Sequence, residues 1–188
     1  MWWREHREGV RRLARLGVAL GAASLVAGCF EPLYGRGPTP GAESVHDKLA
    51  EILIAPIQAR QGSPEARIAV GMHNALQYDL NGNAGADAPT HRLSIILATT
   101  QVTVAVDPAS GRPTAQVDGV TAYYQLVEIA TGKVVVKDMT SAHVDTDTPG
   151  PQQRFAQARA DLNAQDRAIQ VVAEAIRNRL ASYFVAGT

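Results

Sequence analysis

The fold of this chain is decided by residues 91–107, HRLSIILATTQVTVAVD. Apolar and polar residues alternate through this stretch, which is typical of a β-strand with two different faces. A strand of this length would span about 55 Å at ~3.3 Å per residue, two or three times the usual length. We therefore expect one long strand, longer than a small domain needs for its own core.

The alternation changes phase within this strand. Odd positions are apolar in its first half, whereas in its second half the apolar residues are Val102, Val104 and Val106. Because successive side chains point to opposite faces, the buried side is expected to change near residues 99–101, by a bulge or by exchange of the partner strand. We expect this chain to bury one end of the strand, and the other end to project toward something else.

The segments that follow predict an antiparallel meander. Residues 107–111 form a turn, residues 114–129 a second long strand, and the hairpin sequence at 130–133 leads to a third strand over 134–144. In the second strand, one face carries Val120, Ala122, Tyr124 and Leu126. Three adjacent strands joined by short turns pair antiparallel.

Other elements flank the meander. Residues 52–57 are apolar and β-branched, and predict a first strand buried on both faces. A helix is expected from the cap sequence Ser63-Pro64-Glu65 to Asn81-Gly82. Residues 145–153 are expected to form a polar loop, and residues 154–184 a terminal helix. A stripe at seven-residue spacing on that helix is interpreted as packing on the sheet, rather than as a coiled coil with a partner. The stripe consists of Phe155, Leu162, Ile169, Ile176 and Tyr183.

The beginning of the chain has the order of charge, apolar residues and small residues of a secretory signal peptide, over residues 1–28. Its apolar run is about a dozen residues, short of the ~20 that a membrane-spanning helix needs, so a retained transmembrane anchor is the weaker alternative. The only cysteine of the 188 residues, Cys29, follows Val26-Ala27-Gly28, which resembles the bacterial lipobox. We expect a diacylglyceryl group on the Cys29 sulfur, with an ordinary buried cysteine as the alternative. An intramolecular disulfide is excluded.

Composition then divides the chain. Residues 29–48 are rich in proline and glycine and predict a lipidated flexible tether, and residues 49–188 predict a single α+β domain. Phe30, in place of an aspartate after the cysteine, implies sorting to the outer membrane. Without residues 1–28 the chain has 13 basic and 16 acidic residues, which gives no basic excess for nucleic acid.

Catalytic motifs are missing from the sequence. It contains no HExxH, P-loop, G-x-S-x-G or dinucleotide fingerprint. Asp145-Thr146-Asp147 could place two carboxylates on a cation, but it lacks a third acid and is interpreted as part of a solvated turn. We therefore expect no enzyme, no metal and no cofactor apart from the covalent lipid on Cys29.

Three cations near the strand connections could recognise phosphate groups of an anionic lipid: Arg112, Lys133 and Lys137. The alternative is that they are solubilising turn residues. Since alternate connections of a meander lie at opposite ends, Arg112 and Lys133 are not expected to form one patch unless the strands are strongly offset.

Several motifs, in order, resemble the LptE family of lipopolysaccharide-assembly lipoproteins. They are the lipobox with Phe30-x-Pro32-Leu33-Tyr34-Gly35, Ile54-x-Pro56-Ile57 with Arg60 and Gly62, Ala122-x-Tyr124-x-Leu126, Thr131-Gly132-Lys133-Val134, and Phe155-Ala156 with Asp166-Arg167-Ala168 in the terminal helix. Family members commonly have a glycine between the cysteine and the phenylalanine, which is missing here.

The resemblance implies a two-layer sandwich, a four-stranded sheet covered on one side by two helices, in the order β-α-β-β-β-α. It also implies a protein, lipid-anchored on the periplasmic side of the outer membrane, that plugs the β-barrel LptD, helps it assemble and binds lipopolysaccharide. It does not transfer lipid-contacting residues, so the three cations remain hypotheses. The alternative is a free-standing, periplasm-facing lipoprotein that binds a lipid or small apolar ligand in a groove under its helices.

Overall fold

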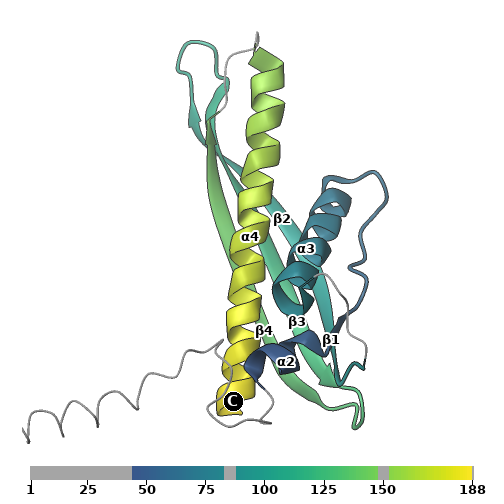
Figure 1. The fold of residues 1–188 in the computed structure, drawn as a ribbon. Helices are drawn as coiled ribbons and strands as arrows, with labels where there is room; N and C mark the ends of the chain where they lie inside the picture. The colour runs from purple at the N-terminus through teal and green to yellow at the C-terminus, as the bar shows by residue number, and fades with distance from the viewer. Residues whose placement is uncertain (1–43, 83–87, 148–152, 188) are drawn as a thin grey trace, which may run out of the picture. The chain divides into compact units, whose positions relative to one another are not determined.

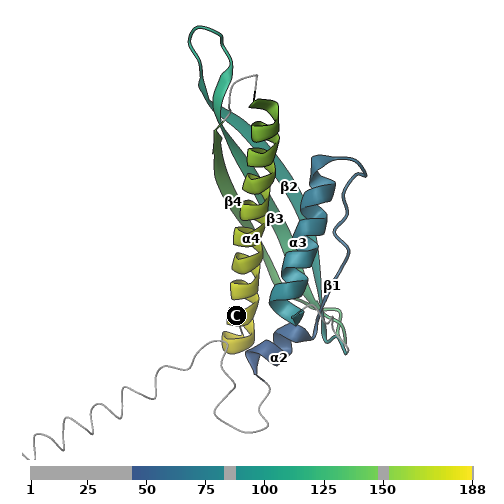
Figure 2. The same cartoon turned by 45° about the horizontal axis from the view of Figure 1, so that its top comes forward.

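The computed structural model describes residues 44–82, 88–147 and 153–187. The predicted signal peptide, Cys29 and residues 29–43 of the predicted tether lie outside the described residues. The described part contains a four-stranded sheet in the order β1-β2-β3-β4 with helices against one face (Figures 1 and 2). Its elements are α2 (Val45–Ala50), β1 (Ile52–Ile54), α3 (Pro64–Asn81), β2 (His91–Val106), β3 (Pro113–Glu128), β4 (Val134–Asp147) and α4 (Arg154–Ala186).

The α+β sandwich expected from the sequence is confirmed. β2, β3 and β4 form the antiparallel meander, and β1 pairs parallel with the first residues of β2 after the crossover through α3. The predicted end of α3 is confirmed, because Gly82 adopts a left-handed conformation at φ 59° and its N–H closes the helix. Ser63 occupies the position before the helix, but its side chain makes no capping hydrogen bond.

Three expectations about local structure were wrong. The first strand ends at Ile54, and it is not buried on both faces because Leu53 is 39% exposed. Residues 45–48, expected in the tether, belong to the helix α2, whose Leu49 is buried. The expected loop at residues 145–147 continues β4, since Asp145 pairs with Val117 and the buried Thr146 donates a hydrogen bond to Asp118 Oδ2 at 3.2 Å.

The core lies between the helices and one half of the meander, which we call the sheet root: residues 91–99 of β2, 120–128 of β3 and 134–142 of β4. Alternate residues of each strand point into this core, and the face of β3 predicted from Val120 to Leu126 is buried as expected. α3 and α4 close it from one side (Figure 1). Its fully buried side chains include Met72 and Leu76 of α3, Leu93 of β2, Leu126 of β3, and Val172, Ile176 and Leu180 of α4.

The helices are tied together and to the start of the sheet by polar contacts. Arg67 of α3 pairs with Asp166 of α4 at 2.9 Å and donates a second hydrogen bond to Gln165 at 3.1 Å. Asn81, at the end of α3, donates to the carbonyl oxygens of Ala50 and Ile52 at 2.7 and 3.3 Å. Buried carbonyl groups need such partners, so Asn81 fixes the junction between α2 and β1.

The remainder of the meander, which we call the sheet tip, extends beyond α3 (Figure 2). It consists of residues 100–106, 113–119 and 143–147 and the turn between β2 and β3. In β2 every residue from Thr100 to Val106 is exposed, which confirms that one end of the strand is buried by this chain and that the other is not.

The sequence predicted that the buried side of β2 changes near residues 99–101. The structure shows no such change. Pairing with β3 runs without a shift from His91 to Thr103, and the irregularities lie between Thr103 and Val106. The change in hydrophobic phase therefore marks the place where the strand leaves its own core.

The apolar stripe of α4 packs on the sheet over only part of its length. Ile169 and Ile176 are buried, whereas Phe155 is 92% exposed and Leu162 is 39% exposed. The apolar side chains in the first turns of α4 are therefore exposed, as those of the sheet tip are.

Candidate functional site

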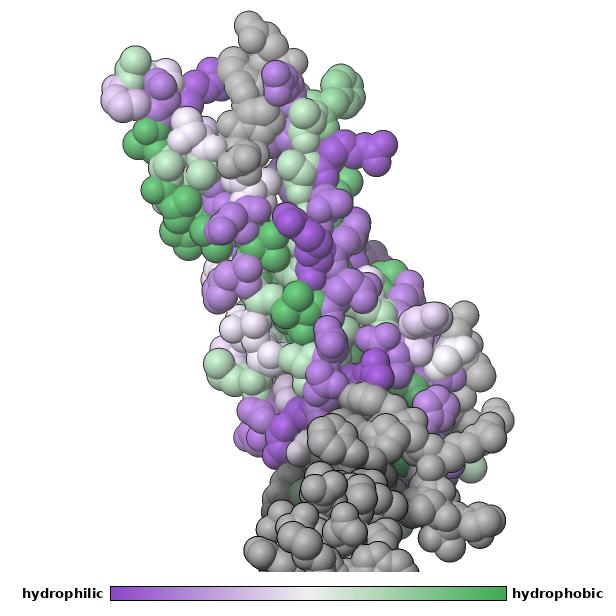
Figure 3. Space-filling model, turned by 60° about the vertical axis from the view of Figure 1, so that its left-hand side comes forward, coloured by the Kyte–Doolittle hydropathy of each residue, from purple (hydrophilic) through white to green (hydrophobic). Residues whose placement is uncertain are grey.

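The first candidate surface is the sheet tip. Val102, Val104 and Val106 are each more than half exposed, and the space-filling view shows hydrophobic surface toward this end of the molecule (Figure 3). Burying apolar side chains lowers the free energy by about 25 cal/mol per Å². A run of exposed valines on a strand is therefore a surface that gains from being covered.

The turn at the end of the sheet tip is held by its own hydrogen bonds. Asp107 Oδ1 accepts from the backbone N–H of Ala109 at 3.1 Å, and from the N–H and hydroxyl of Ser110, both at 2.7 Å. The bonds from Ser110 hold the pKa of the Asp107 carboxyl below its usual value. The turn therefore presents the exposed Arg112 from an ordered hairpin.

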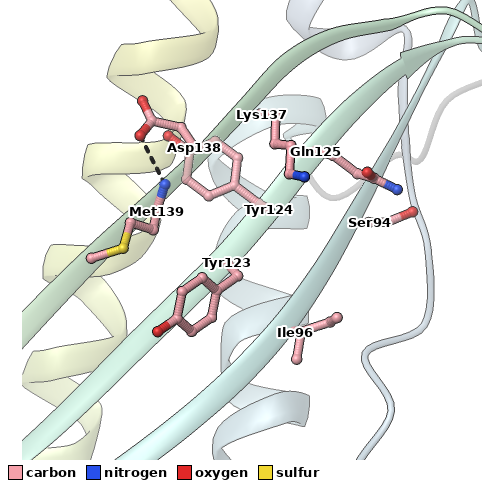
Figure 4. Close-up of a pocket in the computed structure, with 8 residues that line it drawn as sticks. All are labelled: Ser94, Ile96, Tyr123, Tyr124, Gln125, Lys137, Asp138 and Met139. Atoms are coloured by element: carbon pink, nitrogen blue, oxygen red, sulfur yellow. Dashed lines mark hydrogen bonds between the residues drawn. The ribbon is translucent and has the colours of Figure 1, made fainter.

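The second candidate surface is a hollow of about 570 Å³ on the helix-free face of the sheet root, which we call the outer groove (Figure 4). Its lining residues are Ser94, Ile96, Tyr123, Tyr124, Gln125, Lys137, Asp138 and Met139.

Strand register arranges six of these residues in two rows. Ile96 pairs with Tyr123, and Tyr123 with Met139, which gives an exposed apolar row across three strands. The neighbouring row is polar, since Gln125 lies between Ser94 and Lys137 (Figure 4). The outer groove therefore offers an apolar floor beside one cation, which suits an amphiphilic ligand with a negative group.

Two residues that border the outer groove direct their side chains to the helix side of the sheet: Tyr124 is buried in the core and Asp138 contacts α4. Burial raises the pKa of Tyr124 to about 12, and the nearby Asp138 adds to the shift while Arg179 opposes it. Asp138 is held by Arg179 of α4 at 3.3 Å and by the N–H of Met139 at 2.8 Å. Tyr124 remains a neutral phenol at physiological pH, and Asp138 serves a structural link to α4.

A smaller cavity of about 270 Å³ lies under the helices, near the boundary between the sheet root and the sheet tip. Glu65 at the start of α3 accepts from Thr99 Oγ1 at 2.9 Å, and Asp118 accepts from Gln101 at 2.9 Å. Two carboxylates therefore border this cavity, which is less suited to a lipid than the groove that the alternative hypothesis from the sequence places under the helices. Within the described residues, no three His, Cys, Asp or Glu side chains are grouped so that they could hold a metal ion.

The cations singled out from the sequence fall at opposite ends of the sheet. Arg112 lies in the turn after β2, whereas Lys133 lies in the turn after β3, about 50 Å away along a sixteen-residue strand. Arg112 and Lys133 therefore form no common patch. Lys137 lies near Lys133 and lines the outer groove. Cys29 lies outside the described residues.

Sequence reasoning missed the apolar row of the outer groove. Tyr123 alternates with the buried positions of β3, which puts it on the outward face, but its neighbours there are set by the register with β2 and β4. Ile96, Tyr123 and Met139 come from three separate strands, so the sequence could predict this row only if the strand register were already known.

None of the helices in the described part of the chain is long and apolar enough to cross a membrane.

The fold is shared with solved bacterial lipoproteins. A predicted lipoprotein from Caulobacter crescentus CB15 matches with a TM-score of 0.58 at 18% identity, over 76% of this chain and 96% of that one. Lipoprotein B from Nitrosomonas europaea, described as uncharacterized, gives 0.53 at 11% identity, over 81% and 95%. Rare lipoprotein B from Shewanella oneidensis gives 0.51 at 14% identity, over 71% and 96%. The sequence matches no protein-family model and no curated protein. At these identities the likeness is one of fold: the described domain has the lipoprotein B fold.

Proposed function

We propose that this chain is a non-enzymatic, lipid-anchored outer-membrane lipoprotein that plugs the β-barrel LptD, helps it assemble and binds lipopolysaccharide during its insertion into the outer leaflet. The observation that carries this proposal is the sheet tip, where β2 continues for seven residues, Thr100 to Val106, without burying one of them. A domain that functions alone gains nothing from exposed valines at the end of a long hairpin. A narrow hairpin that enters a protein lumen would bury them.

Two further observations agree with the proposal. The resemblance of the ordered motifs is to the LptE family, and the fold is that of solved proteins named lipoprotein B. The lipid on Cys29 would keep the domain at the membrane on the periplasmic side, since a multiply acylated anchor is lasting.

The test is co-purification with LptD from detergent-solubilised outer membranes. We expect a stoichiometric complex with the wild-type chain, and less surface lipopolysaccharide when the chain is depleted. Val104→Lys should weaken the complex, because it places a charge in the surface that the barrel covers. The matched control is Val171→Lys, an equally exposed valine of α4.

Two results would reject the plug. One is a preparation in which LptD is recovered without this chain. The other is equal recovery of LptD with Val104→Lys and with wild type.

The anchor has its own test. Cys29→Ser should accumulate as an uncleaved or soluble precursor without lipid. Labelling of Cys29→Ser by radioactive palmitate, with retention in the outer membrane, would contradict lipidation at this residue.

A second function is favoured by the outer groove, a hollow of about 570 Å³ with an apolar floor. A free-standing lipoprotein would hold a lipid or small apolar ligand against Ile96, Tyr123 and Met139. The two functions differ in one measurement. A ligand carrier is recovered alone with bound lipid, whereas a plug is recovered with the barrel.

A further inference from the structure

The edge of the sheet along β2 is largely without a partner strand. β1 pairs only with His91, Arg92 and Leu93, and the last backbone bond on this side is from the N–H of Ala55 to the carbonyl of Leu93 at 2.9 Å. The chain then leaves the edge at Pro56. β2 continues for thirteen residues beyond Leu93, the last residue that pairs with β1.

The backbone groups that point away from β3 can be identified from the pairing. The Leu93 carbonyl accepts from the N–H of Ala55 on the side of β1, so Leu93 directs its backbone groups away from β3. Since these directions alternate along a strand, the odd residues after Leu93 direct their N–H and C=O groups outward. Among the described residues, no backbone hydrogen bond is made to the outward groups of Ile95, Leu97, Thr99, Gln101 and Thr103. We call these five residues the free β2 edge.

The opposite edge of the sheet is protected in the ways that proteins use against strand addition. β4 carries Lys137, Asp138 and Asp145, and α4 packs along it (Figure 1). Charges and a covering helix deter an incoming strand. β2 has no charged residue and no proline between Ser94 and Val106. The difference between the two edges indicates that the β2 side is left open.

The neighbouring elements limit what can occupy the free β2 edge. β1 takes up the same edge below it, and α3 starts beside it, with Glu65 bonded to the Thr99 hydroxyl at 2.9 Å. A second copy of the chain would bring its own α3 against this one. A single extended segment fits, because it needs only the width of one strand, about 4.8 Å.

We propose that the free β2 edge is a strand-addition site, which takes up an extended, uncharged segment of the barrel partner as a fifth strand. This inference rests on the proposed function, since it names how that partner is held. Main-chain hydrogen bonds would supply the affinity, and the exposed valines beside the edge would favour apolar side chains in the incoming segment. Because β2 has no charged residue along this edge, it offers no ion-pair partner to a charged side chain, and we therefore expect the incoming segment to be uncharged.

The first experiment is hydrogen–deuterium exchange, resolved to single amides, on the lipidated chain alone and in complex with LptD. In the chain alone, the outward amides of Gln101 and Thr103 should exchange rapidly, while the amides of Thr100 and Val102, bonded to β3, are slow. In the complex, the outward amides should slow at least about tenfold. Unchanged exchange of these amides in an intact complex would overturn the strand-addition site and leave the plug standing.

The second experiment uses a pair of variants, of which one keeps the outward backbone N–H and the other lacks it. Gln101→Pro removes an outward N–H, which an edge strand tolerates, and Gln101→Ala keeps it. Both lose the bond from the Gln101 side chain to Asp118, so that loss cancels in the comparison. We expect Gln101→Pro to bind LptD about tenfold more weakly than Gln101→Ala. Equal binding by the two folded variants would contradict the proposal.

Folding of both variants is checked by circular dichroism. If Gln101→Pro is unfolded, Thr103→Pro against Thr103→Ala makes the same comparison one position further along the edge. Two further outcomes are distinct from these. Failure to form any complex with LptD removes the proposed function and the strand-addition site with it. Concentration-dependent protection of the outward amides in the chain alone would assign the edge to a second copy instead.

Discussion

The two halves of one sheet differ in what holds them. In the sheet root, alternate residues of β2, such as Leu93 at 0% and Ile95 at 6% exposure, are buried beneath the helices. In the sheet tip the same strand keeps its regular pairing with β3 as far as Thr103 but has no core, and Val102 is 56% exposed. Backbone pairing can thus be continuous where side-chain burial is not. Burial in the sheet root explains why the domain folds. The exposed apolar side chains of the sheet tip are explained only by a partner outside this chain.

The largest effect is expected from a cavity in the sheet root. Leu126→Ala removes a side chain with 0% exposure, and we expect the free energy of unfolding to fall by about 2–5 kcal/mol. Val104→Ala, in the sheet tip, should change it by less than about 0.5 kcal/mol. Urea denaturation of the mature domain measures both. Similar losses for the two variants would contradict the division into root and tip.

The boundary between the halves should be sensitive to added volume. Gly119 lies on the helix-free face between Thr100 and His143. A Cβ atom there would overlap Thr100 Oγ1 and lie 2.9 Å from His143 Nδ1. We expect Gly119→Ala to destabilise the domain by about 1–3 kcal/mol.

The control for Gly119→Ala is the same change in a Thr100→Ala background. Removing the Thr100 hydroxyl relieves the overlap, so the cost measured by urea denaturation should fall. A cost that stays the same in both backgrounds would show that the close approach is not its cause.

A smaller, pH-dependent effect is expected where α4 meets this boundary. Burial, with a contribution from the charge of Asp118, raises the pKa of Asp161 above the usual aspartate value of 3.8. An acid with a raised pKa destabilises the folded state once it ionises, so this cost is absent below pH 3.8 and fully present above the folded-state pKa. Asp161→Asn should therefore raise the melting temperature at pH 7. The gain should be small, because solvent screens a partly buried carboxyl.

Thermal unfolding from pH 3 to pH 7 tests this expectation. The difference between Asp161→Asn and wild type should shrink as the pH falls and vanish at the acidic end. A difference that is constant across this range would not come from the ionisation of Asp161.

The smallest effect on stability is expected from replacing the cations Lys137 and Arg112. These two variants should instead differ in how they bind lipopolysaccharide. Lys137 lines the outer groove, whereas Arg112 lies at the far end of the sheet tip. We expect Lys137→Ala to weaken lipopolysaccharide binding several-fold, about as much as the loss of one charge-assisted contact, and Arg112→Ala to leave it unchanged. Both variants should unfold like wild type. The reverse order of effects on binding would move the lipid contact to the sheet tip.

The sequence predicted the order of elements well because their signals are local. Alternation identified β3, and its buried face from Val120 to Leu126 is correct. Helical spacing and Gly82 fixed α3. These patterns depend only on neighbours within a few residues, and tertiary context did not override them.

The errors arose where pairing between distant residues decides the outcome. Asp145 and Thr146 read as a polar loop, but β3 extends far enough to pair with them and Asp118 accepts from Thr146. The phase change in β2 was interpreted as a change of buried face, because the sequence does not show where α3 stops covering the sheet.

The candidate sites were predictable only in part. The sequence separated Arg112 from Lys133 correctly, because the ends of a meander alternate. The sequence did not show the outer groove, which depends on the register that aligns Ile96, Tyr123 and Met139. The free β2 edge was also hidden, since it follows from β1 ending after three residues.

The uncharged stretch of β2 also affects how the chain behaves after synthesis and before a partner covers this strand. A long, proline-free segment rich in β-branched residues is the kind that nucleates cross-β aggregates when it stays exposed. The chain is therefore expected to precipitate when it is overproduced, and to need a steady supply of whatever covers β2. Its cellular abundance should be limited by that supply rather than by its own rate of synthesis.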